Sequence, residues 1–356
     1  MTLFRRYILG LSLGTAGGLL FWQLGLPLPW MLGALSATMI ASVCGLPLAG
    51  PDRFRPWVVA VIGVMLGARF SPEVMAQALS WLGSLGLLTL CLIAMGLVNV
   101  PFYRFIGGYD WRTSYFAGMP GGLAEMIELA EAKGGKVQPV ILSHSLRIVV
   151  TIALIAVWFR LILGHSVGSG AGFSVALSWS EAGLLLAAAV FGSLIGRALR
   201  WPAPTFLGPM ALSAVLHLSG ISESAPPGIL VNAAQIVLGT VLGCRFRGVP
   251  LAALRHAALL SLGSTALILG LALGFSWAMQ ALLGIDMMQA LLALAPGGLT
   301  EMGLIALAIE ADVAFVALHH VVRILIVLVA APLVFTLFDR RLGKSHPGSD
   351  PGSGPG

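Results

Sequence analysis

A block with a Pro-Gly-Gly run and a glutamate occurs twice in the chain, as MPGGLAEM at 119–126 and as APGGLTEM at 295–302. Proline and glycine interrupt helices, and an interruption frees backbone N–H and C=O groups that can bind a ligand. A carboxylate can bind a cation or exchange a proton. The candidate binding residues in the two blocks are Pro120, Gly121, Gly122 and Glu125, and Pro296, Gly297, Gly298 and Glu301.

Histidine and arginine follow each block at a constant distance. Arg147 lies 22 residues after Glu125, Arg323 lies 22 residues after Glu301, and a histidine precedes each arginine by three residues. That spacing places His144 with Arg147, and His320 with Arg323, on one helix face. His319 is a further candidate whose counterpart is Ser143.

These residues predict two Glu–His–Arg clusters that bind a substrate or coupling ion, or relay protons. Two structural alternatives remain open. The arginines could form ion pairs with the glutamates, and the histidines could serve only as hydrogen-bonded core residues.

The composition requires that these clusters lie in a membrane. Apolar residues make up 58% of the 356-residue chain, charged residues only 10%, and the mean hydropathy is +0.96. Soluble domains carry about 25% charged residues. The net charge of +6 is too dispersed for a nucleic-acid surface, and the three cysteines have no spacing typical of a disulfide framework or a metal site. We therefore expect an all-α polytopic membrane protein that contacts the lipid bilayer and needs no cofactor.

The two blocks belong to a tandem duplication. PLPWMLG at 27–33 resembles PAPTFLG at 202–208, LGARF at 66–70 matches LGCRF at 242–246, and all markers, the His/Arg pairs included, are offset by 175 or 176 residues. We expect a first membrane repeat at 1–163, an external linker at 164–180, a second repeat at 181–342 and a disordered cytoplasmic tail at 343–356.

Each repeat has five clear apolar spans of the length that a bilayer requires. They lie near 7–25, 28–46, 56–71, 76–98 and 137–163, and near 181–200, 203–220, 227–244, 256–283 and 313–338. The segments that hold the blocks, at about 113–135 and 289–311, are either sixth spans or re-entrant elements that enter and leave on one side.

The distribution of lysine and arginine favours five crossings per repeat. With a cytoplasmic N-terminus, that topology places 16 of the 20 basic residues on the cytoplasmic side, whereas six crossings divide the loop residues evenly. Five crossings predict inverted repeats, each with a re-entrant Pro-Gly-Gly helix, and both termini in the cytoplasm. The equivalent Arg69 and Arg245 then follow span ends, where we interpret them as structural cations near helix C-termini.

Inverted repeats with interrupted helices are typical of secondary transporters. We therefore expect a permease that moves a small, anionic substrate by alternating access between the two blocks. A channel and a membrane-embedded regulator of gene expression are the alternatives. The oligomeric state is open, a homodimer included.

Two copies of the Pro-Gly-Gly block, each followed by SHSLRI or LHHVVRI, resemble the AbrB duplication family of bacterial inner-membrane proteins. Members are labelled as ammonia monooxygenases or as regulators of aidB expression. The resemblance covers both repeats and implies the fold and the membrane location. A monooxygenase needs metal ligands at suitable spacing, and the seven histidines provide none, so we expect no catalytic activity.

Overall fold

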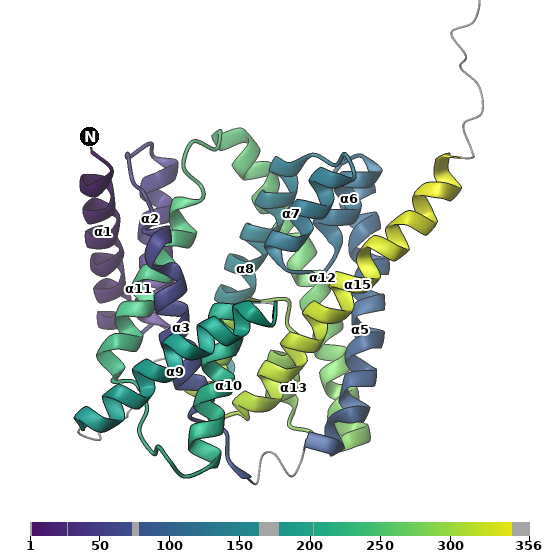
Figure 1. The fold of residues 1–356 in the computed structure, drawn as a ribbon. Helices are drawn as coiled ribbons and strands as arrows, with labels where there is room; N and C mark the ends of the chain where they lie inside the picture. Colours follow the sequence, from purple (N-terminus) through teal and green to yellow (C-terminus); the bar gives the residue numbers. More distant parts are fainter. Residues whose placement is uncertain (1, 27, 73–77, 164–177, 202, 344–356) are drawn as a thin grey trace, which may run out of the picture.

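The computed structural model describes residues 2–26, 28–72, 78–163, 178–201 and 203–343, and every regular element within these ranges is helical (Figure 1). Residues 164–177 of the expected linker, nearly all of the expected tail, Pro27 and Pro202 lie outside the described residues. The helices of the first half are α1 (Leu3–Gln23), α2 (Pro29–Val43), α3 (Arg55–Gly67), α5 (Leu82–Pro101), α6 (Trp111–Gly118), α7 (Leu123–Ala132) and α8 (Val137–Leu163). Those of the second half are α9 (Trp179–Ala198), α10 (Pro204–Leu218), α11 (Gly228–Cys244), α12 (Leu251–Leu283), α13 (Met287–Leu294), α14 (Leu299–Ala308) and α15 (Val313–Gly343).

Each of the ten apolar spans expected from the sequence contains a helix. Five of the described helical stretches are long and apolar enough to cross a membrane, namely 82–106, 137–155, 179–198, 251–283 and 313–337. The first of these continues α5 through a π-helical turn at Phe102–Ile106, next to Pro101. The helix lengths and their composition indicate a membrane protein.

The helices form two groups, and each group contains equivalent elements of both halves. α1, α2, α3, α9, α10 and α11 pack on one another and lie toward the left in Figure 1. The second group consists of α5 to α8 with α12 to α15, of which α5, α6, α12 and α15 lie toward the right in the figure and α8 lies near its centre. In the left group α1 packs on α2, and α9 packs equivalently on α10. The halves also exchange partners, because α2 contacts α11 and α3 contacts α10.

Glycines allow the helices of the left group to approach closely, as in membrane helix pairs generally. A Cβ atom at Gly17 of α1 would overlap the carbonyl oxygen of Gly33 in α2, and one at Gly208 of α10 would overlap that of Gly192 in α9. The same backbone contact therefore occurs once in each half.

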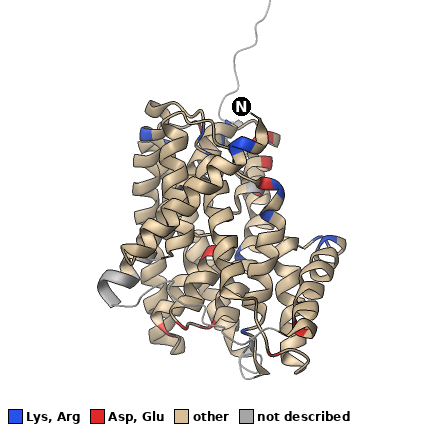
Figure 2. Ribbon diagram, turned by 90° about the vertical axis from the view of Figure 1, so that its left-hand side faces the viewer, with Lys and Arg blue, Asp and Glu red and all other residues tan. Residues whose placement is uncertain are grey.

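The charged side chains are distributed unevenly along the height of the molecule. Most of the lysine and arginine residues lie toward the end at which the N-terminus is found (Figure 2). In Figure 1 α6 and α7 also lie toward that end, whereas α13 lies toward the opposite end.

Candidate functional site

Both Pro-Gly-Gly blocks interrupt a helix, as the sequence predicts. α6 ends at Gly118 and α7 begins at Leu123, while α13 ends at Leu294 and α14 begins at Leu299. Proline has no N–H to continue the helix, and the glycine before each second helix has an extended backbone, with φ/ψ of −69°/147° at Gly122. The carbonyl groups at the end of α6 and of α13 thus lose their helical partners.

In the first half, α8 supplies partners for these carbonyl groups. His144 Nε2 lies 2.8 Å from the carbonyl oxygen of Phe116, and Arg147 Nη1 donates to the carbonyl of Met119 at 3.1 Å. Because a carbonyl only accepts, Nε2 of His144 must carry the proton. Arg147 Nη2, 2.7 Å from His144 Nδ1, then donates to that nitrogen. His144 is therefore a neutral imidazole with a fixed tautomer, which makes it a poor proton relay in this arrangement.

In the second half, α15 repeats this arrangement with one difference. His320 Nε2 lies 2.9 Å from the carbonyl oxygen of Leu292, and Arg323 Nη1 donates to Ala295 at 2.6 Å. Both carbonyls lie 28 residues before their partners, as in the first half. However, Arg323 Nη2 donates to the carbonyl of Gly297 at 2.9 Å, and His320 Nδ1 has no partner among the described residues.

These contacts explain how the chain tolerates two helix breaks within the protein. The histidine and arginine side chains are at most 6% exposed, so their hydrogen bonds satisfy carbonyl groups that water cannot reach. Asn99 of α5 adds another such bond, because its Nδ2 donates to the carbonyl of Gly118 at 2.7 Å. The positive arginine also complements the negative end of the preceding helix dipole. The Nε atoms of both arginines are buried and have no partner among the described residues, so one donor of each is still available.

The glutamates occupy a different position from the one that ion pairing requires. Glu125 and Glu301 are partly exposed, and each lies in the first turn of the second short helix. Their carboxylates fold back over the start of that helix, since a Cβ atom at Gly122 or Gly298 would overlap them. An acid in the first turn stabilises a helix through its dipole.

Within the described part of the chain, no ion pair links either glutamate to an arginine. The Glu–Arg ion-pair alternative is therefore wrong for this conformation, in which the arginines bind carbonyl groups. Glu301 does accept a hydrogen bond, from the Thr300 hydroxyl at 2.9 Å.

His319 lies apart from the helix breaks. Its Nδ1 contacts the carbonyl of Phe315 at 2.8 Å and its Nε2 contacts the Ser84 hydroxyl of α5 at 2.9 Å. The side chain is buried, and its ring lies against that of Phe315. His319 thus joins α15 to the start of α5 instead of joining the His320–Arg323 cluster.

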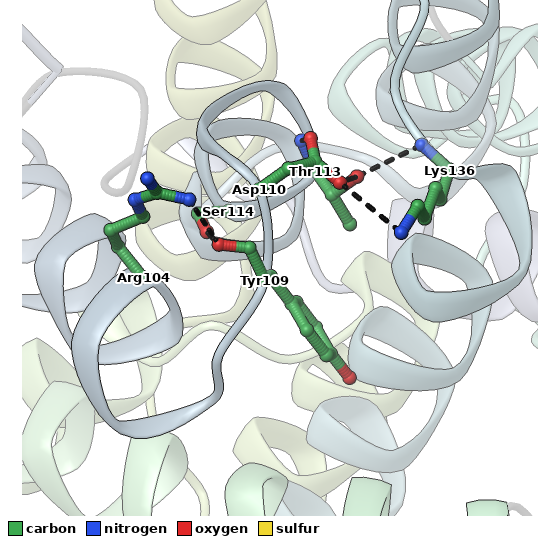
Figure 3. Close-up of polar contacts among 6 residues, drawn as sticks. All are labelled: Arg104, Tyr109, Asp110, Thr113, Ser114 and Lys136. Carbon is green, nitrogen blue, oxygen red and sulfur yellow. Dashed lines mark hydrogen bonds and ion pairs between the residues drawn. The ribbon is translucent and has the colours of Figure 1, made fainter.

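Two aspartates that the sequence reasoning missed fix the outer ends of the broken elements. Asp110 caps α6 by accepting from the backbone N–H and the hydroxyl of Thr113, and Asp286 caps α13 in the equivalent position. Figure 3 shows Asp110 beside Thr113, with Lys136 reaching both from the start of α8. In the same view, Arg104 and Ser114 donate to the carbonyl of Tyr109. An aspartate directly before an apolar helix is an N-cap signal that could have identified both residues.

Each broken element contacts the last helix of the other half. A Cβ atom at Gly121 of the first block would lie 2.9 Å from Val327 of α15, and α14 contacts α8. The positive charges of Arg147 and Arg323 lie close enough to repel each other. Each block therefore borders the last helix of the other half.

Comparisons with known proteins find a family and relatives that match most of the chain. The family model described as "Transition state regulatory protein AbrB" matches residues 30–339. The chain is 27% identical over 318 residues to the Escherichia coli (strain K12) protein named "Putative regulator AbrB", covering 88% of this chain and 91% of that protein. It is 22% identical over 365 residues to "Uncharacterized protein YhjN" of Bacillus subtilis (strain 168), covering 94% of this chain and 93% of that protein.

Proposed function

Because the chain belongs to the AbrB family, whose model spans most of its length, we propose that the arrangement described above serves a membrane permease shared by this family. The permease would move a small, anionic substrate through a site between the two Pro-Gly-Gly blocks. The observation that carries this proposal is the pair of helix breaks held in equivalent ways by His144 with Arg147 and by His320 with Arg323.

The proposed topology is an inverted pair of five-span repeats with cytoplasmic termini in the bacterial inner membrane. α6 and α7 have 8 and 10 residues, as have α13 and α14. At 1.5 Å per residue these helices are about 12–15 Å long, roughly half of a bilayer core. The positions of α6, α7 and α13 at opposite ends of the molecule support two re-entrant elements that enter from opposite sides (Figure 1).

In this proposal the site residues have divided roles. Arg147 and Arg323 hold the breaks open and offer their Nε–H groups to the substrate, and the starts of α7 and α14 attract its negative charge. Glu125 and Glu301, being partly exposed, bind a coupling proton or cation. Alternating access would transfer the substrate between the two sides as the two groups of helices shift.

Uptake into proteoliposomes tests the transport proposal. A screen of metabolite anions would compare the native protein with Glu125→Gln and Glu301→Gln, and with Glu128→Gln as a matched control because Glu128 is exposed and its counterpart is Leu304. We expect saturable uptake that both site variants reduce and the control retains. Unchanged uptake in two folded site variants would return the glutamates to a structural role.

Reporter fusions test the topology separately. Fusions at Pro250 and Asp312, which flank α12 to α14, should report opposite sides of the membrane, with Pro250 on the side of Arg53. If Pro250 and Asp312 reported the same side, α13 and α14 would not form a re-entrant element.

The names of the family and of the Escherichia coli relative favour one alternative, a membrane-embedded regulator of gene expression without transport. That function predicts no flux for any substrate. A channel is the other alternative and predicts flux that neither saturates nor depends on a second gradient. The uptake screen therefore distinguishes all three functions.

A further inference from the structure

A cavity of about 300 Å³ lies at the junction of α1, the α2–α3 connection and the end of α11. Its polar lining consists of Tyr7, Asp52, Arg245 and Arg247, together with the Cys244 thiol. Leu3, Leu48 and Val241 supply apolar walls. The volume is at the lower end of the range for small-molecule sites, which is about 300–1,000 Å³.

Arg245 is the least compensated charge in this cavity. The side chain is partly buried, and among the described residues its guanidinium group has neither a hydrogen bond nor an ion pair. Burial lowers the pKa of Arg245 from its ordinary value, and repulsion from Arg55 lowers it further, while Asp52 and Glu301 only partly oppose these effects. A guanidinium group in such surroundings favours an anionic partner.

The surrounding charges strengthen this preference. Arg247 also lines the cavity, where its Nη1 donates to the carbonyl of Leu48 at 3.1 Å and leaves its remaining donors available. The positive charges of Arg55, Arg245 and Arg247 thus outnumber the two negative charges, Asp52 and Glu301, that act on Arg245. Guanidinium groups bind phosphate and carboxylate oxygens in pairs, and the Tyr7 hydroxyl can donate another hydrogen bond.

We propose that this cavity is an anion-binding site that takes the phosphate or carboxylate group of a soluble anion or of a lipid headgroup. The repeat-equivalent position, at the end of α3 and the start of α9, lacks the same chemistry, because Ser71 takes the place of Arg247 and Ala182 takes the place of Tyr7. The site therefore occurs at only one of the two equivalent positions. This assignment replaces the purely structural role that the sequence suggested for Arg245.

The test uses Cys244, which lines the cavity, as a reporter of its occupancy. The full-length protein is reconstituted in phosphatidylcholine nanodiscs, and the rate at which the negatively charged sulfonatoethyl methanethiosulfonate modifies Cys244 is measured by mass spectrometry. One arm adds inorganic phosphate, and the other replaces a fifth of the lipid with phosphatidylglycerol. At ligand concentrations ten times the Kd, we expect the rate to fall about tenfold by mass action.

Protection by phosphate would identify a soluble anion, and protection by phosphatidylglycerol a lipid headgroup. Arg245→Gln should abolish protection, whereas the matched variant Arg69→Gln should retain it. Absence of protection in both arms, or equal protection in Arg245→Gln, would overturn the proposal. The measurement involves no flux, so its outcome is independent of transport.

A second measurement needs no arginine variant and remains decisive if Arg245→Gln does not fold. The exposed Cys44 is an internal reference in the native chain. Relative to Cys44, Cys244 should prefer the negatively charged reagent over the positively charged trimethylammonium analogue by about fivefold, since a nearby cation favours an anion by roughly 1 kcal/mol. An equal preference at the two cysteines would refute an electropositive cavity.

Discussion

Replacement of Arg323 by methionine should destabilise the protein more than any change at Glu301. Methionine fills a similar volume but donates no hydrogen bond, so the carbonyl groups of Ala295 and Gly297 would both lose their partner. A buried carbonyl left unsatisfied costs about 1–3 kcal/mol, which gives a loss of about 2–6 kcal/mol for Arg323→Met. Arg147→Met should cost a similar amount, because it removes the partners of two buried acceptors, the carbonyl of Met119 and Nδ1 of His144.

The assay is reversible denaturation in mixed detergent micelles, followed by circular dichroism. Arg323→Gln is the matched control, since its amide can still donate to one of the two carbonyl groups and should recover part of the lost stability. Glu301→Gln should change the free energy of unfolding by no more than about 0.5 kcal/mol, because that side chain is partly exposed and lacks an ion pair among the described residues.

A double-mutant cycle gives the sharpest test of this reasoning. Residues that do not interact show additive effects, so Glu301→Gln and Arg323→Met should couple by less than about 0.5 kcal/mol. His320 and Arg323 both bind carbonyl groups at the end of the same helix, so His320→Ala and Arg323→Met should show a measurable coupling energy. A coupling above about 1 kcal/mol between Glu301 and Arg323 would falsify the assignment of Arg323 to the carbonyl groups and restore the ion pair.

Three further sets of substitutions follow from local geometry. Glu310 has φ of 58°, and Glu310→Gly should stabilise the protein by about 1 kcal/mol in the same denaturation assay, since glycine adopts this backbone without strain. Asp110→Ala and Asp286→Ala should each cost about 0.5–2 kcal/mol as lost helix caps. Although burial opposes the shift, hydrogen bonds from Thr113 and the charge of Lys136 hold the pKa of Asp110 below its ordinary 3.8. The stabilisation that the Asp110 carboxylate provides is thus complete above pH 3.8 and is lost as the pH falls through the lower pKa of the folded state. Denaturation at low pH should detect this loss of stability in the native protein but not in Asp110→Ala. Gly192→Val, which would overlap the backbone of Gly208, should cost about 3 kcal/mol or more, while Gly183→Val, which faces open space, should fold normally by size-exclusion chromatography.

The helices and their interruptions were accessible to sequence reasoning because they depend on local chemistry. Apolar runs predict the spans, and Pro120 and Pro296 predict where two helices break. The internal repeat added the information that a single copy lacks, since it identified His144, Arg147 and their counterparts as equivalent before any contact was known.

The partners of these side chains could not be predicted in the same way. Charge complementarity suggested that Arg323 pairs with Glu301, but the structure has it bound to carbonyl oxygens 26 and 28 residues earlier in the chain. Every residue carries a carbonyl group, so the sequence does not distinguish the ones that a helix break leaves unsatisfied. The cavity at Arg245 was missed for a related reason, because it combines segments near residues 3–7, 48–52 and 241–247.

The exchange of partners between α2 and α11, and between α3 and α10, has a consequence for biosynthesis. When ribosomes complete α8, the face of α2 that meets α11 and the glycine-lined face of α3 that meets α10 have no partner, and they must wait in the membrane until α10 and α11 are inserted. Neither half is therefore an autonomous folding unit, although each contains a full set of equivalent helices. A gene divided between α8 and α9 should yield two fragments that are degraded when expressed singly and accumulate when expressed together. A half-length ancestor would have needed a second copy of itself to complete the same contacts.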